Sequence, residues 1–215
     1  MNHPSFDSEL RQARFVKSVP DATRAPPDIG VEVAFAGRSN AGKSSALNAV
    51  TGSRSLARTS KTPGRTQHLV FFALRDERRL VDLPGYGFAR VPAPVQRRWR
   101  HAMETYLSRR RSLRGLILVM DIRHPLTDYD RQLLDWCAHA GLPVHALLTK
   151  ADKLGYGRAK STLLAVRRTL AREFPGVQVQ LFSAPKGTGL EEARAALKRW
   201  LRGGAAEGGG PTQDL

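Results

Sequence analysis

Short apolar runs alternate along this chain with longer stretches in which apolar residues recur every three or four positions. Runs of the first kind predict buried strands, and the longer stretches predict amphipathic helices. Strands are expected at 31–36, 68–74, 78–81, 116–120, 144–148 and 177–181, and helices at 45–50, 94–111, 127–140, 158–174 and 190–202. This alternation predicts an α/β three-layer sandwich: a mostly parallel six-stranded sheet with helices on both faces.

Two segments of the pattern depart from this regularity. A short charged turn separates 68–74 from 78–81, which favours antiparallel pairing, so one strand is expected to run against the others. Residues 1–28 are polar, and we interpret them as an N-terminal arm, with Phe15, Val16 and Val19 as candidates for pinning it. The sandwich then spans 29–202, and the glycine-rich residues 203–215 are expected to be a disordered tail.

The loop after the first expected strand carries the pattern G-x-x-x-x-G-K-[ST] at every fixed position. Its glycines allow backbone N–H groups to curl around phosphate oxygens, while the helix start adds positive potential and Lys43 reaches the terminal phosphates. A chance match is the alternative, and the strand–loop–helix context argues against it. The expected nucleotide contacts are Gly37, Arg38, Ser39, Asn40, Ala41, Gly42, Lys43 and Ser44.

A second motif, Thr149-Lys150-Ala151-Asp152, follows a buried strand at its carboxyl end, where open α/β sheets bind ligands. The Asp152 carboxylate can accept both the N1–H and the exocyclic amine of guanine. Adenine offers a lone pair at N1 and would leave the carboxylate unpaired. Alone the motif is weak, because such an aspartate also suits a helix N-cap. After the next strand, Ser183 and Ala184 are expected to present backbone N–H groups to the guanine oxygen, and Phe182 is a further expected nucleotide contact.

The charge of the chain points to a polyanionic partner. Lys and Arg number 35 against 19 Asp and Glu, a net charge of +16. Residues 90–114 contain eight arginines and a single acid, Glu104, and we expect them to contact RNA phosphates. The alternative is an ordinary solvated helix face. The arginines expected on the basic face are Arg97, Arg98, Arg100, Arg109, Arg110 and Arg111.

Other features narrow the class of protein. Cys137 is the only cysteine, which excludes an internal disulfide, and its apolar helical context indicates a buried small hydrophobe. No apolar run approaches the roughly 18 residues of a membrane span, and the N-terminus has no secretory apolar segment. We therefore expect a cytoplasmic monomer without membrane association.

The ordered motifs resemble the translation-factor-related class of P-loop GTPases. More closely, the chain resembles the EngB/YihA/YsxC family of ribosome-biogenesis GTPases between about residues 15 and 200. The stretches that carry the resemblance are GRSNAGKSS, KTPGRTQ, VDLPGYGFA, DIRHPL, LTKADKL and SAPKGTG.

The resemblance implies roles for particular residues. Ser44 would bind Mg²⁺ directly, Thr66 would add a second ligand in the triphosphate state, and Asp82 would reach the ion through water. Thr62 competes with Thr66, and spacing does not choose between them. The N–H of Gly85 would face the γ-phosphate, so Lys43, Thr66 and Gly85 are the expected catalytic residues. The remaining expected nucleotide contacts are Gly64, Arg65, Gln67, His68, Leu83 and Pro84.

The residue after Gly85 bears on the expected rate. Tyr86 stands where signalling GTPases often carry a water-orienting glutamine, and a phenol with a pKa of about 10 is a poor base at neutral pH. Slow hydrolysis of GTP is expected, accelerated by a partner or a cation. Asn40 matches an asparagine that ligates potassium in related GTPases, although it equally suits a turn.

The resemblance also implies a partner, the large ribosomal subunit, and a role as a nucleotide-gated switch in its assembly. Two alternatives stay open at this point. One is a regulator of cell division or septation that acts through a protein partner. The other is an ATPase with the same phosphate loop.

Overall fold

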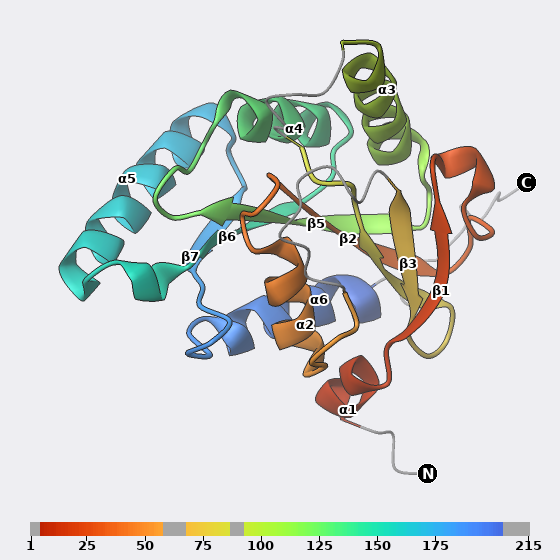
Figure 1. Cartoon of the computed structure of the whole chain (residues 1–215), viewed down its shortest axis with the longest axis horizontal. Helices are drawn as coiled ribbons and strands as arrows, with labels where there is room; N and C mark the ends of the chain where they lie inside the picture. Colours follow the sequence, from red (N-terminus) through yellow and green to blue (C-terminus); the bar gives the residue numbers. More distant parts are fainter. Residues whose placement is uncertain (1–4, 58–67, 87–92, 204–215) are drawn as a thin grey trace, which may run out of the picture.

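The computed structural model describes residues 5–57, 68–86 and 93–203 (Figure 1). The strands are β1 Arg14–Val19, β2 Val31–Gly37, β3 Leu69–Ala73, β4 Arg78–Asp82, β5 Leu113–Asp121, β6 Val144–Thr149 and β7 Gln178–Leu181. The helices are α1 Phe6–Arg11, α2 Lys43–Thr51, α3 Ala93–Arg109, α4 Asp128–His139, α5 Tyr156–Glu173 and α6 Leu190–Gly203, with short 3₁₀ turns η1 Ala22–Arg24 and η2 Ala151–Lys153. Each helix within these ranges is too short or too polar to span a bilayer.

The strands form one sheet in the order β1-β3-β4-β2-β5-β6-β7. The central strand β2 pairs parallel with β4 and β5, and β6 pairs parallel with β5 and β7. β3 pairs antiparallel with both β1 and β4, so it is the strand that runs against the others. The prediction of a mostly parallel sheet with one reversed strand is confirmed.

The sheet separates two layers of helices. Helices α3, α4 and α5 cover one face, and α1, α2 and α6 cover the other (Figure 1). Alternate residues of β2 enter the two cores, because successive side chains of a strand point to opposite faces. Ala34 and Ala36 join the first core, which also buries Cys137, whereas Val33 and Phe35 join the second. The predicted three-layer sandwich is confirmed.

The sheet has seven strands instead of the six expected, because part of the N-terminal arm is itself a strand. Five of the six residues of β1 are exposed. Because the strand has no buried face, its sequence does not show the apolar alternation that indicates a half-buried strand. Phe15 and Val16 do not pin the arm, since they are 60% and 43% exposed. Val19 alone of the three residues named for that role is buried.

Helix α1 anchors the beginning of the arm, in addition to the pairing of β1 with β3. Phe6 and Leu10 are buried in the second core. The carboxylate of Glu9 accepts hydrogen bonds from Arg78 at 2.5 Å and from Arg202 at 3.3 Å, which ties α1 to β4 and α6. The boundary at residue 28 stays a prediction. Gly203, expected to begin the disordered tail, is the last residue of α6, and residues 204–215 lie outside the described residues.

A buried carboxylate anchors the end of α3 to the sheet. Glu32, on β2, is fully buried and accepts hydrogen bonds from Arg110 Nη2 at 2.6 Å, Tyr106 Oη at 3.0 Å and Arg79 Nη1 at 3.3 Å. A charge in the core is tolerated only when it is paired in this way. The Arg110 side chain is accordingly only 7% exposed. The expectation that Arg110 belongs to the exposed basic face is wrong.

This network predicts that truncation of two adjacent arginines, Arg110 and Arg111, will change the stability of the protein by very different amounts. Arg110→Ala should lower the free energy of unfolding by about 3 kcal/mol, because it leaves the Glu32 charge with weaker partners. Arg111→Ala, which truncates an exposed side chain, should change it by about 0.5 kcal/mol or less. Urea unfolding followed by circular dichroism measures both, and equal losses would contradict the buried role of Arg110.

Candidate nucleotide-binding site

The phosphate-loop pattern connects the carboxyl end of β2 to the start of α2. Asn40 and Gly42 have positive φ angles of 61° and 99°, which turn the chain back on itself. Gly42 is also the N-cap of α2, and it offers no side-chain acceptor to the N–H groups of the first helical turn. A helix start of this kind presents free amide groups to an anion. The loop therefore has the backbone geometry that its sequence pattern predicts.

Lys43 and Asp82 form a buried ion pair at the base of the loop. Lys43 begins α2 and Asp82 ends β4, and their side chains are 9% and 8% exposed. Asp82 is brought there by the parallel register of the sheet, in which it lies beside Phe35 of β2. Ser44, the expected magnesium ligand, follows Lys43 and is half-buried. The three residues expected around the terminal phosphates and the metal thus lie together.

The turn after β4 lies directly against the phosphate loop. Leu83 donates its N–H to the carbonyl of Phe35 at 2.9 Å, and Ser39 donates its N–H to the carbonyl of Tyr86 at 2.9 Å. Gly85 comes so close that a Cβ there would lie 3.5 Å from the Cα of Ser39. Leu83 and Pro84 are buried, so they hold this turn against the interior of the protein.

Tyr86 does not direct its side chain to the phosphate loop. It is 2% exposed, and its hydroxyl donates a hydrogen bond at 2.7 Å to Oδ1 of Asp130 in α4. Burial, together with the neighbouring carboxylate, raises the pKa of Tyr86 well above its usual value. The phenol is therefore even less suited to act as a base than its sequence position suggests. Asp130 itself was expected only in the capping box at the start of α4, which is also present.

The motif after β6 is bonded to the phosphate loop. The Thr149 hydroxyl lies within hydrogen-bond distance of the carbonyl oxygens of Ala41 and, at 3.0 Å, of Met120. Lys150 Nζ donates to the carbonyl of Asn40 at 2.6 Å, so its side chain lies along the loop. These bonds join two segments that are more than a hundred residues apart in the chain.

Asp121 is a site residue that sequence reasoning missed. It ends β5, and Oδ2 accepts hydrogen bonds from Lys150 at 2.9 Å and Arg123 at 2.6 Å. Burial acts to raise its pKa, but the hydrogen bonds from Arg123 and Lys150 hold the pKa of Asp121 well below its ordinary value. The available signal was the same as for Asp152, namely a carboxylate at the carboxyl end of a buried strand.

Asp152 is held in place by Ser183, which follows β7. The Ser183 hydroxyl donates to Oδ1 of Asp152 at 2.6 Å, and this bond holds the pKa of Asp152 below its ordinary value. Asp152 lies within η2, whose N-cap is Lys150, so the alternative that it caps a helix is wrong. Its carboxylate is 13% exposed and keeps one oxygen free of the Ser183 bond.

The segment after β7 differs in detail from the expectation. The N–H of Ser183 is donated to the carbonyl of Thr188 at 3.0 Å, so the expectation that it faces guanine is wrong. The Phe182 side chain is buried in the second core, and its carbonyl accepts from Ala151 N at 3.1 Å. Phe182 therefore positions the site without reaching into it. Ala184 is half-buried and is left as the candidate for a backbone contact to the base.

The expected first switch falls largely outside the described residues. Gly64, Arg65, Thr66 and Gln67 all lie in the undescribed range 58–67, as does Thr62. The described residues that flank that range, Ala57 and His68, both have hydrogen-bond partners. Asn48 of α2 pairs with Ala57 through its side-chain oxygen and nitrogen, at 2.8 and 2.9 Å, and His68 Nδ1 lies 3.1 Å from the hydroxyl of Ser18.

A glycine-bearing loop on a helix start, with carboxylates at neighbouring strand ends, defines a P-loop nucleotide-binding protein of the GTPase class. Comparison with protein families agrees: the family described as 50S ribosome-binding GTPase matches residues 32–150, more than half of the chain. The chain belongs to this family. The sequence-based interpretation as a ribosome-associated P-loop GTPase is confirmed.

Solved structures share the fold. A probable GTP-binding protein engB superposes with a TM-score of 0.63 at 22% identity, covering 80% of this chain and 100% of the other. Era, solved with MgGDPNP and nucleotides 1506–1542 of 16S ribosomal RNA, gives 0.62 at 21% identity, covering 86% and 59%. A bacterial selenocysteine-specific elongation factor, EF-Sec, gives 0.59 at 23% identity, covering 81% and 29%.

The hydrogen bond between the end of β6 and the phosphate loop predicts what loss of the Thr149 hydroxyl does to stability and to nucleotide binding. Thr149→Val should lower the free energy of unfolding by about 1–2 kcal/mol, because buried carbonyl oxygens lose their donor. It should also weaken GDP binding, since the loop is no longer held. Thr149→Ser keeps the hydroxyl and should retain both properties. Urea unfolding and titration calorimetry with GDP measure them; a loss in Thr149→Ser with none in Thr149→Val would show that the methyl group, not the hydroxyl, matters.

Proposed function

We propose that this protein binds Mg²⁺–GTP at the site described above, hydrolyses it slowly, and uses the nucleotide state to control its binding to ribosomal RNA. The observation that carries the proposal is the Asp152–Ser183 pair, joined to the phosphate loop through Thr149 and Lys150. This arrangement supports the view that Asp152 selects the base. It also supports a fixed distance between that carboxylate and the helix start that would bind the phosphates.

The base would be chosen by hydrogen-bond complementarity. A carboxylate only accepts, and guanine offers two donors on the edge that would face Asp152. Because the Ser183 hydroxyl occupies one lone pair of Oδ1, the carboxylate is oriented before the base arrives. Adenine would offer the carboxylate a lone pair at N1 in place of a donor, which is the stronger source of discrimination.

The phosphates and the metal would bind at the Lys43–Asp82 pair. In the described conformation the ammonium is paired with Asp82, so nucleotide binding must exchange that partner for phosphate oxygens and release the carboxylate. The half-buried Ser44 hydroxyl and the Asp82 carboxylate are oxygen donors of the kind that Mg²⁺ prefers, and Thr66 is proposed as a further ligand. When bound, the ion would neutralise charge on the phosphates.

Slow hydrolysis is consistent with the position of Tyr86. Its hydroxyl is engaged by Asp130 in the core, so it is not positioned to orient an attacking water. Lys43, Gly85 and Thr66 remain the proposed catalytic residues, and they act on charge that develops on the phosphates. A potassium ion beside Asn40 remains a hypothesis that rests on the family resemblance.

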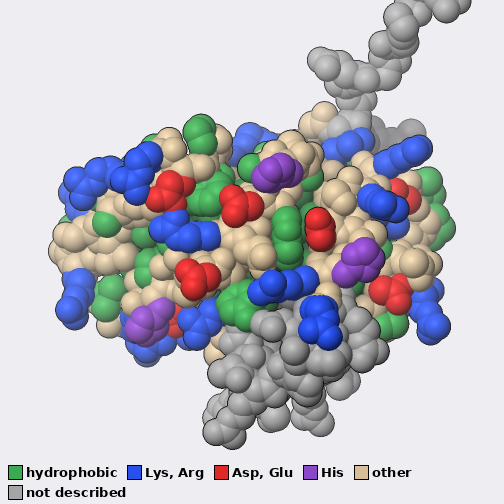
Figure 2. Space-filling model, turned by 90° about the horizontal axis from the view of Figure 1, so that it is seen from above, with side chains coloured by type: hydrophobic (Ala, Val, Ile, Leu, Met, Phe, Trp, Pro, Cys, Tyr) green, Lys and Arg blue, Asp and Glu red, His purple; other side chains and the backbone are tan. Residues whose placement is uncertain are grey.

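The proposed RNA contacts lie on α3 and the turn after it. Arg97, Arg100, Arg109 and Arg111 are exposed, Arg110 is excluded by its burial, and the side chain of Arg98 lies outside the described residues. Figure 2 shows basic side chains interspersed with acidic ones over the face it presents, so charge alone does not mark a binding surface there. Membership of the ribosome-binding family and the likeness to Era, solved with rRNA, support RNA as the partner.

Base selection is tested by one substitution. Asp152→Asn should lower GTP affinity by about 100-fold or more, because an amide N–H₂ would meet the donors of guanine. The same amide can donate to the second carbonyl of xanthine, so affinity for xanthosine triphosphate should rise. Fluorescent-nucleotide titration measures both. Ser183→Ala, which keeps the carboxylate but frees it, should cost less than Asp152→Asn. An unchanged preference between GTP and ATP would favour the ATPase alternative.

The RNA surface is tested by two charge reversals of equal size. Arg97, Arg100 and Arg109, changed together to Glu, should abolish co-sedimentation of the GTP-loaded protein with large ribosomal subunits, since phosphate contacts dominate such binding. Arg158, Arg167 and Arg168 on α5 are equally exposed and provide the matched control, which should retain binding. Both variants should bind GTP normally. Equal losses would reject α3 as the docking surface, and binding that survives nuclease treatment would favour the alternative of a protein partner.

A further inference from the structure

We propose that the Tyr86 hydroxyl and Asp130 form a latch by which α4 holds the Asp82–Gly85 turn against the phosphate loop, and that the latch sets the preference for GTP over GDP. Tyr86 and Asp130 act here as positioning residues. The inference rests on the proposed function, in which Gly85 contacts the γ-phosphate that only GTP carries.

The backbone of the turn is aligned with the phosphate loop in the described conformation. Tyr86 and Arg38 form a parallel bridge, in which Ser39 N–H donates to the carbonyl of Tyr86 at 2.9 Å. The N–H of Tyr86 lies 3.4 Å from the carbonyl of Gly37, which is a long bond. The backbone bond closest to Gly85 on its carboxyl side is thus the long one, so the side chain of Tyr86 can add to the attachment of the turn.

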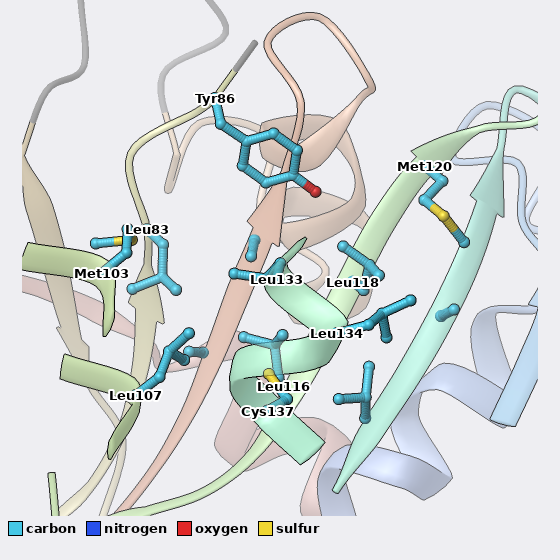
Figure 3. Packing of buried hydrophobic residues seen from close by; sticks show 14 of the residues in the cluster. Leu83, Tyr86, Met103, Leu107, Leu116, Leu118, Met120, Leu133, Leu134 and Cys137 are labelled. Carbon is cyan, nitrogen blue, oxygen red and sulfur yellow. The ribbon is translucent and has the colours of Figure 1, made fainter. Parts of the chain in front are cut away.

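The Tyr86 side chain supplies the stronger attachment. Figure 3 shows its ring turned away from the turn and set over the leucines of the first core, among them Leu133 and Leu118. The hydroxyl at the end of the ring reaches Oδ1 of Asp130 at 2.7 Å, and Asp130 is 1% exposed. A hydrogen bond to a carboxylate in such a dry environment is stronger than one at the surface, and leaving either partner unpaired is costly.

Asp130 is itself rigidly held. Its other oxygen, Oδ2, accepts from the N–H and the hydroxyl of Thr127, both at 2.8 Å, in the capping box that begins α4. The carboxylate is therefore shared between the helix start and Tyr86, one oxygen for each. The acceptor cannot follow the turn if the turn moves, so the bond to Tyr86 is either made in this arrangement or lost.

The consequence is specific to the triphosphate. A turn already held beside Ser39 needs little ordering before Gly85 meets a γ-phosphate, whereas GDP offers that glycine no partner. If the latch is removed, the competent arrangement is populated only in part, and the apparent affinity falls by that fraction. The loss should appear for GTP and not for GDP.

The test compares three variants with the wild-type protein in their affinity for a non-hydrolysable GTP analogue and for GDP, each with magnesium. Tyr86→Phe removes the hydroxyl and keeps the ring; it should weaken the GTP analogue about tenfold and leave GDP within about twofold. Asp130→Asn, which neutralises the acceptor, should change the ratio in the same direction. Thr127→Val removes the hydroxyl donor to the other oxygen but keeps the backbone N–H that holds Asp130 and the bond to Tyr86, so its ratio should equal that of the wild type.

A second measurement separates the latch from a general loss of structure. Amide hydrogen exchange of the nucleotide-free protein should quicken at Leu83 and Tyr86 in Tyr86→Phe, but not in Thr127→Val. An unchanged GTP-to-GDP ratio in Tyr86→Phe, or an equal loss for both nucleotides, overturns the latch. Wild-type protein that binds neither guanine nucleotide overturns the proposed function, and the latch with it.

Discussion

Parallel pairing from β4 to β7 brings the carboxyl ends of five strands to one edge of the sheet, and each part of the site depends on that constraint. β2 delivers the phosphate loop there, β4 ends in Asp82, β5 in Asp121 and β6 in Thr149. Hydrogen bonds from Thr149 and Lys150 then tie the phosphate loop to the segment that follows β6. Because β5 alone lies between β2 and β6 in the sheet, the distance between the two segments is set by strand spacing and not by the length of chain between them.

Burial divides the charged residues of this basic chain into groups with different roles. Glu32, Arg79 and Arg110 pair in the core and fasten α3 to the sheet. Lys43 and Asp82 pair at the site, where a ligand can exchange partners with them. The exposed arginines of α3 are left for contacts outside the molecule. A count of charges treats these groups alike, although only the exposed one contributes to the field that a polyanion meets.

The site and α3 are connected by aromatic packing. The ring of Tyr129, in α4, lies 6.2 Å from that of Tyr86, and the guanidinium of Arg100 lies 6.0 Å from the Tyr129 ring. The turn that follows Asp82 therefore packs, through α4, against a helix whose arginines face outward. This packing connects the turn beside the phosphate loop to the helix that carries the exposed Arg97, Arg100 and Arg109.

The sequence alone determined the succession of most strands and helices along the chain, the phosphate loop and the class of protein, because these are local patterns with a strict period or spacing. It did not reveal β1, whose exposed residues leave no apolar alternation, nor the burial of Arg110, which looks like its neighbours in the chain. Asp121, Ser183 and Tyr86 likewise acquire their contacts only across the sheet. Tertiary structure decided these points, since burial and hydrogen-bond partners depend on residues that are remote in sequence.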